Sequence, residues 1–72
     1  MTLDLHGIRH QDVQQLLDSF IWINMERGEA TATVITGNSP VMKQIVKAVT
    51  DEYGFRAFDC MHNTAELVID FI

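Results

Sequence analysis

A carboxylate and an imidazole lie two residues apart near the start of the chain, in the run Leu3-Asp4-Leu5-His6-Gly7. Alternation of polar and apolar residues predicts a strand from Thr2 to His6. Because successive side chains of a strand point to opposite faces, we expect Asp4 and His6 on one face of a sheet. Side chains of these two types can bind a metal ion or transfer a proton. The same alternation also fits a strand with one face in water, where Asp4 needs no function.

The remaining residues predict two helices and three further strands. Apolar residues at helical spacing predict helices over about residues 11–27 and 40–53, which end at Gly28 and Gly54. The expected buried stripes are Val13, Leu16, Leu17, Phe20, Ile21 and Ile23 in the first helix and Met42, Ile45, Val46, Val49 and Tyr53 in the second. Trp22 and Met25 are expected in the core or at its edge; alternatively they are exposed and mark a partner surface.

The strands complete the prediction of the fold. β-branched residues favour a strand over residues 31–36, and residues 55–59 and 65–71 are predicted to form a hairpin. The order βαβαββ, with right-handed crossovers, predicts an α/β two-layer sandwich. Its four-stranded mixed sheet would carry both helices on one face. The other face would be open and would carry Asp4, His6, Glu66 and Asp70.

Size and composition limit the possible functions. The chain has 72 residues, which predicts a single domain over residues 1–72 with a small core, and a homodimer is one way to support such a core. Cys60 is the single cysteine, which favours a reducing cytoplasm. No stretch approaches the ~20 apolar residues of a membrane span, so no membrane partner is expected. Ten acidic and five basic residues give a net charge of -5, which argues against tight nonspecific binding to phosphates.

Two polar loops are expected at one edge of the sheet. Residues 6–10 and 36–40 each follow a strand and precede a helix, and ligands of open α/β sheets bind at that edge. Gly37 would let the backbone approach a ligand, and the amides at the start of the second helix would face an anion, with Lys43 one turn further along. Alternatively, the second loop only makes a turn and caps the helix through Ser39, with Pro40 at the first helical position.

These motifs resemble those of the small MutS-related (Smr) domain family. The family motif LDLHG matches Leu3 to Gly7 at all five positions. The second family motif, TGxG or HGxG, matches Thr36 and Gly37 but departs at Ser39, where a second glycine is expected. The element order agrees along essentially the whole chain. The resemblance implies the fold of the C-terminal domain of translation initiation factor three, and it implies nuclease activity, since several Smr domains nick DNA or cleave RNA, often with a divalent metal.

Carried over to this chain, the resemblance makes Asp4 and His6 the catalytic pair of an endonuclease. The partner would be DNA or RNA and the cofactor Mg²⁺ or Mn²⁺, with no metal ligands assigned. The residues expected to bind the substrate are Gly7, Arg9, Thr36, Gly37, Asn38, Ser39 and Lys43.

Two departures favour a different class of function. The Cβ of Ser39 narrows the approach of a phosphate, and Pro40 removes one amide donor from the helix start. Together with the acidic net charge, they favour a catalytically inactive Smr-like module that binds a partner, or forms a homodimer through the open sheet face or the last strand. Two further histidines have no assigned role: His10 is expected to face solvent, and His62 with Cys60 supplies only two of the four ligands of a usual zinc site.

Overall fold

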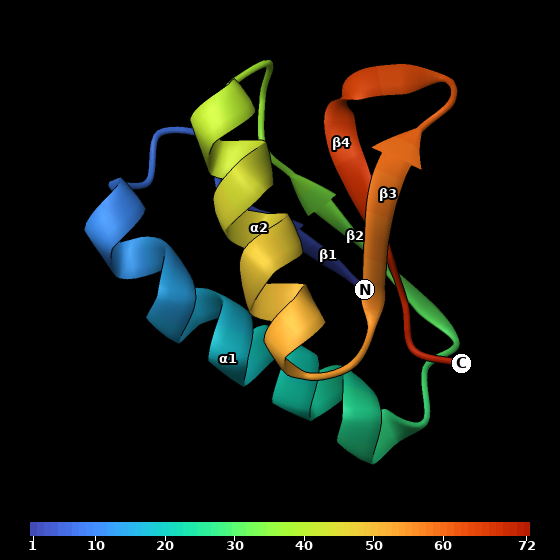
Figure 1. Ribbon diagram of the computed structural model, residues 1–72. Coiled ribbons are helices and arrows are strands. Elements are labelled where there is room, and N and C mark those ends of the chain that lie inside the picture. The colour runs from blue at the N-terminus through green and yellow to red at the C-terminus, as the bar shows by residue number, and fades with distance from the viewer.

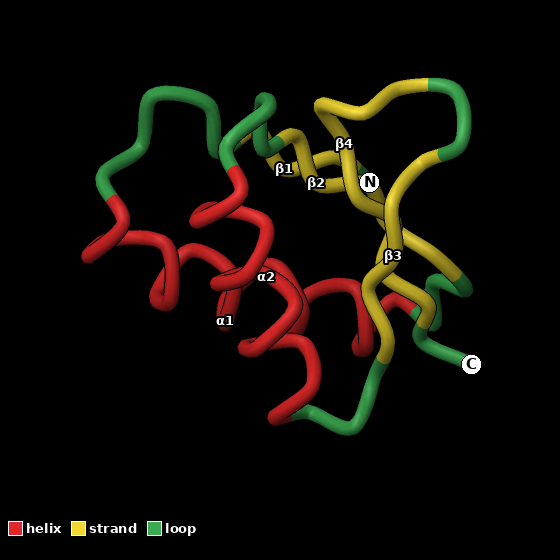
Figure 2. Tube along the Cα trace, turned by 45° about the horizontal axis from the view of Figure 1, so that its top comes forward, coloured by secondary structure: helices red, strands yellow, loops and turns green.

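A mixed sheet with two helices on one face makes up the computed structural model, which describes residues 1–72 (Figure 1). The elements are β1 (Thr2–Asp4), α1 (His10–Arg27), β2 (Thr31–Ile35), α2 (Pro40–Glu52), β3 (Arg56–Cys60) and β4 (Asn63–Asp70). The strand order is β1-β2-β4-β3; β1 pairs parallel with β2, and β4 pairs antiparallel with β2 and β3. Figure 2 shows both helices on the same side of the sheet. The predicted βαβαββ order and α/β fold are confirmed.

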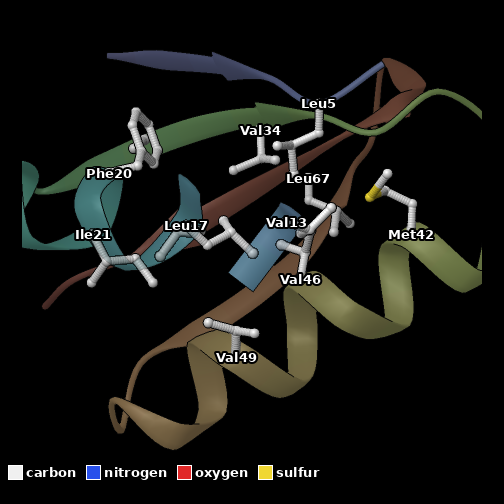
Figure 3. Close-up of a cluster of buried hydrophobic side chains, with 12 residues drawn as sticks. Leu5, Val13, Leu17, Phe20, Ile21, Val34, Met42, Val46, Val49 and Leu67 are labelled. Atoms are coloured by element: carbon white, nitrogen blue, oxygen red, sulfur yellow. The ribbon is translucent and has the colours of Figure 1, made fainter. Parts of the chain in front are cut away.

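The hydrophobic core lies between the sheet and the helices (Figure 3). The sheet contributes Leu5, Ala32, Val34, Leu67 and Ile69, and the helices contribute Val13, Leu17, Phe20, Ile21, Met42, Val46 and Val49. Leu5 lies just beyond the end of β1 and is fully buried, so the second leucine of the LDLHG motif anchors the chain where it leaves the sheet.

The predicted stripe of α1 is wrong at Leu16 and Ile23, which are 39% and 42% exposed. The buried residues of α1 centre on Leu17 and Phe20, and positions 16 and 23 lie roughly a quarter of a turn from that centre. Trp22 is 58% exposed, so it does not lie in the core and the alternative of an exposed position applies. Met25 is exposed as well. α1 therefore presents several large apolar side chains to solvent, at its flanks and on its outer side.

Tyr53 is not part of the core either, because it follows the end of α2 and is exposed. Its Oη donates a hydrogen bond of 2.7 Å to Oδ1 of Asp18 and so connects the end of α2 to α1. This hydrogen bond raises the pKa of the Tyr53 phenol above its ordinary value. Neither α1 nor α2 has the length and apolar character that crossing a membrane requires.

Asn24 is a fully buried polar residue on the core face of α1, which the hydrophobic pattern did not reveal. Its Nδ2 donates to the carbonyl of Phe20 at 2.7 Å, whereas its Oδ1 has no hydrogen-bond partner. We expect Asn24→Leu to raise the free energy of unfolding by about 1 kcal/mol, because it removes a buried unpaired acceptor and keeps the branched shape. The thermal midpoint should rise by about 4–8 °C. Asn24→Ala, which leaves a cavity, should lower it, and a midpoint below wild type in both variants would contradict the explanation.

Candidate active site

The chain turns sharply after β1 and places His6 outside the sheet. Oδ1 of Asp4 accepts a hydrogen bond of 2.9 Å from the backbone N–H of His6, and Gly7 follows with a φ of 82°. An aspartate that bonds the amide two residues on is a common turn former. The prediction that Asp4 and His6 share one sheet face is therefore wrong, because β1 ends at Asp4 and this turn redirects the imidazole.

The loop after β2 is held against the start of β4. The amides of Thr36 and Gly37 both donate to the carbonyl of Ala65, at 2.9 and 3.1 Å. The buried hydroxyl of Thr36 lies 2.8 Å from the Gly37 carbonyl and also bonds Ala65. Oδ1 of Asn38 accepts a bond of 3.0 Å from the hydroxyl of Thr64. These contacts hold the loop after β2 against the start of β4, so the side chains of Thr36 and Asn38 stabilise the conformation of the loop.

The imidazole of His6 lies against Gly37. A Cβ built on Gly37 would lie 3.2 Å from Cδ2 of His6, closer than nearly all such contacts in proteins. Gly37 also has a φ of 66°, which favours glycine. The second motif therefore supplies a residue without a side chain at the position where the histidine of the first motif packs.

A cavity of about 560 Å³ lies between these two loops, which run side by side at one edge of the sheet (Figure 1, Figure 2). Its lining includes no carboxylate and no lysine or arginine. The lining residues are Leu5, His6, Gly7, Ile8, His10, Ile35, Thr36, Gly37, Asn38, Ser39, Met42 and Ala65. The predicted meeting of the two loops is confirmed.

The starts of both helices border this cavity. α1 begins at His10, and its N-cap residue Arg9 makes no side-chain capping bond. α2 begins at Pro40, and Ser39 caps it as predicted by accepting a bond of 3.1 Å from the amide of Met42. The first amides of a helix have no partner within the helix, and its N-terminus attracts anions. In the first turn of α2, however, Pro40 has no N–H and the amides of Met42 and Lys43 both donate to Ser39, so this turn offers few free amides to an anion.

The structure brings six of the nine predicted site residues together in the lining: His6, Gly7, Thr36, Gly37, Asn38 and Ser39. The other three lie outside it. Asp4 contacts His6 through the backbone, and Arg9 pairs with Asp12 at 3.5 Å. The ammonium of Lys43 donates to the carbonyl of Thr64 and lies 3.9 Å from a carboxylate oxygen of Asp59. Lys43 is thus held by β3 and β4.

His10 belongs to the expected loop of residues 6–10 but is not among the nine predicted site residues, and the structure places it in the lining. It is exposed, as predicted, but it shares the cavity with His6. The helix was expected to start at Gln11, and the start at His10 places this side chain on the loop edge. No Ser, Thr, Asp or Asn stands immediately before Gln11 to cap a helix there. The sequence therefore did not define the first residue of the helix.

The donor set of this cavity does not fit Mg²⁺ or Mn²⁺. Such cations prefer carboxylate and other oxygen ligands, whereas the lining offers two imidazoles, hydroxyls and one side-chain amide. No three His, Cys, Asp or Glu side chains gather anywhere in the chain in a way that would hold a metal. Asp4 does not line the cavity, and its Oδ1 accepts the amide of His6.

Comparison with known proteins gives one family. The family model of the Smr domain matches residues 3–64, which include both loops and all nine predicted site residues. No curated protein and no solved structure matches the chain significantly.

Proposed function

The chain belongs to the Smr domain family, and on this basis we propose that it cleaves phosphodiester bonds of a nucleic acid in the cavity between the two loops. Smr domains are associated with nucleic-acid binding and nicking endonuclease activity. The observation that carries the proposal is the position of His6, whose imidazole packs on Gly37 and lines the cavity. Imidazole changes its protonation between about pH 5 and 8, so it can take up or release a proton during cleavage.

In this proposal Asp4 is a positioning residue. Its carboxylate fixes the turn through the amide of His6 and lies outside the cavity lining. Gly7 permits the turn, and Thr36 and Asn38 keep the second loop in place. The N-terminal amides of α1 would bind the phosphate.

We expect His6→Ala to lower the cleavage rate by about 10²–10⁴-fold, the range usual for loss of an acid–base group. The assay uses labelled single- and double-stranded DNA and RNA, each in EDTA, Mg²⁺ and Mn²⁺. His62→Ala is the matched control, because His62 is exposed in the β3–β4 turn and does not line the cavity. Unchanged cleavage by His6→Ala would reject the proposal.

The same assay separates two roles of Asp4. Asp4→Asn keeps an oxygen that can accept the amide of His6, so a positioning role predicts that it retains most of the activity and that Asp4→Ala loses it. If both variants lose activity equally, the charge of the carboxylate is what matters.

A second candidate function is that of a binding module without catalysis, and one observation favours it. Leu16 and Ile23 are exposed about two turns apart on one side of α1, and exposed apolar side chains aligned in this way are typical of interaction surfaces. A chain that cleaves none of the substrates and sediments as a dimer at every salt concentration would have this function. Binding that weakens steeply with salt would instead indicate phosphate contacts.

A further inference from the structure

The two edge strands of the sheet differ in how well they are protected from pairing with another chain. β3 has an irregular register at Asp59 and Cys60, and Lys47 of α2 lies 3.7 Å from the carboxylate of Asp59. Irregularities and lysines of this kind keep an edge strand from adding a further strand. β1, at the opposite edge, has a regular register and no lysine (Figure 2). β1 is therefore the edge that is more open to pairing.

The bonds between β1 and β2 show which backbone groups of β1 are free. The carbonyl of Met1 accepts the amide of Thr33 at 3.0 Å, and the amide of Leu5 donates to β2 at 2.8 Å. Successive residues of a strand direct these groups to alternate sides. The N–H and C=O groups of Thr2 and Asp4 therefore point away from β2, where no other strand of the sheet pairs with them.

Four exposed side chains form a line along α1, which we call the α1 stripe: Asp12, Leu16, Ile23 and Arg27. At about 100° per residue, their positions fall within about 60° of one another around the helix axis. Asp18, which accepts a hydrogen bond from the residue that follows α2, lies on roughly the opposite side of α1. The α1 stripe therefore faces away from α2.

The α1 stripe lies on the same side of the molecule as the free edge of β1. Nη1 of Arg27, at the end of the stripe, donates to Sδ of Met1 at 3.9 Å. α1 begins at His10, after the turn that follows β1, so the helix runs back past the strand. The middle of the stripe, next to Ser19, is therefore close to the middle of β1, at Leu3.

We propose that the chain forms a homodimer in which β1 pairs antiparallel with β1 of a second copy while the two α1 stripes pack on each other. A two-fold axis at Leu3 places Thr2 of each copy opposite Asp4 of the other, so that the two aspartates do not face each other. Each of these pairs exchanges two backbone hydrogen bonds, and the two sheets become one. The dimer is separate from the proposed function, because none of the residues that it brings together lines the cavity.

The order of residues in the α1 stripe fits a second copy better than it fits an unrelated partner. In an antiparallel pair of helices centred next to Ser19, Leu16 meets Ile23 of the second copy. Asp12 then meets Arg27 of the second copy, and the two-fold axis repeats both contacts. The stripe is negative at one end, apolar in the middle and positive at the other end, so it is complementary to itself in the reversed direction. Ser19 is small and exposed, which lets the two helices approach closely.

The first test measures the oligomeric state by sedimentation equilibrium from about 1 μM to about 1 mM, a range that covers weak and moderate affinities. We expect the wild type to form a dimer as its concentration rises. Leu16→Glu and Ile23→Glu should each raise the dissociation constant by about 100-fold or more, because the symmetric dimer would bury each carboxylate twice without a partner. Trp22→Glu is the matched control, since Trp22 is 58% exposed on α1 but lies outside the stripe. It should leave the dissociation constant unchanged.

The second test exchanges the charges of the stripe. Asp12→Arg makes both ends of the stripe positive and Arg27→Asp makes both ends negative, so each variant alone should dimerise about 10-fold more weakly. An equimolar mixture of the two variants should form a heterodimer with close to the wild-type dissociation constant, because each arginine then meets an aspartate. Recovery in the mixture cannot arise from a change in the folding of either variant.

A wild type that stays monomeric up to about 1 mM would overturn the inference. A dimer that Leu16→Glu and Ile23→Glu leave intact, or that Trp22→Glu weakens as much, would also overturn it. The same holds if the two charge variants associate no more tightly in the mixture than alone. Cleavage is not measured in these experiments, so their failure is distinct from failure of the proposed function.

Discussion

Gly37→Ala is expected to lower the cleavage rate by about 10-fold while the domain stays folded. The new Cβ would lie 3.2 Å from Cδ2 of His6, so the imidazole must move away from the loop. The contact requires a shift of a few tenths of an ångström, so the loss should be smaller than the roughly 10²-fold that a displacement of about 1 Å can cost. The rate on the substrates named above and the thermal midpoint of the same preparation measure the two effects separately.

Gly28→Ala provides a matched control for the backbone. Gly28 ends α1 with a φ of 68°, almost the same as the 66° of Gly37, but a Cβ there would have no neighbouring atom within 4 Å. Both variants should therefore lose a similar amount of stability, about 1–2 kcal/mol, because both force a side chain into the left-handed region. Only Gly37→Ala should lose activity. Equal activity in the two variants would show that the contact between His6 and Gly37 has no role in positioning the imidazole.

Local sequence signals predicted the elements well because each one is specified within its own segment. The β-branched run of β2, the Ser39 cap with Pro40 after it, and the glycines that end the helices depend on neighbours only a few residues away. The alternation in β4 placed Leu67 and Ile69 on the buried face for the same reason. Such features are readable from one sequence.

Two features of the site depend on interactions that the alternation of polar and apolar residues does not encode. The alternation of polar and apolar residues continues through His6. The strand nevertheless ends at Asp4, where the backbone N–H of His6 donates to the Asp4 carboxylate and forms a turn. Asp4 therefore acts as a turn former, a role that competes with a place in a strand. Similarly, His10 lies at the edge of the loop because α1 begins at His10, one residue before the expected start of the helix.

The contacts of the Lys43 side chain are a third feature that could not be predicted from the sequence. Its place one turn into α2 suggested a phosphate contact, yet β4 inserts between β2 and β3 and brings Thr64 within reach of its ammonium. Strand order is a property of the whole fold, since β4 comes last in the chain but pairs in the middle of the sheet. The sequence shows the positive charge of Lys43, but the residues that contact its ammonium depend on the pairing of strands far apart in the chain.

Leu5→Ala is expected to lower the free energy of unfolding by about 2–5 kcal/mol, the usual range for a buried leucine. A chain of 72 residues has a total stability of about 4–11 kcal/mol at about 0.05–0.15 kcal/mol per residue, so this one change removes a large share. Leu5 is fully buried, and its amide donates to the carbonyl of Ile35 at 2.8 Å. Because β1 is a short strand at the edge of the sheet, few other contacts of the first motif can replace that anchor. Urea unfolding followed by circular dichroism measures the loss.

Leu16→Ala is the matched control, because it makes the same chemical change on the exposed side of α1 and should cost less than about 1 kcal/mol. The comparison also bears on function, since Leu5 lies between the residue that forms the turn and the histidine that the turn positions. Cleavage by Leu5→Ala, measured at a temperature where the variant is still folded, should therefore fall further than cleavage by Leu16→Ala. If the two variants were equally stable and equally active, the buried anchor would not be what holds His6 at the cavity, and the turn at Asp4 alone would have to place it.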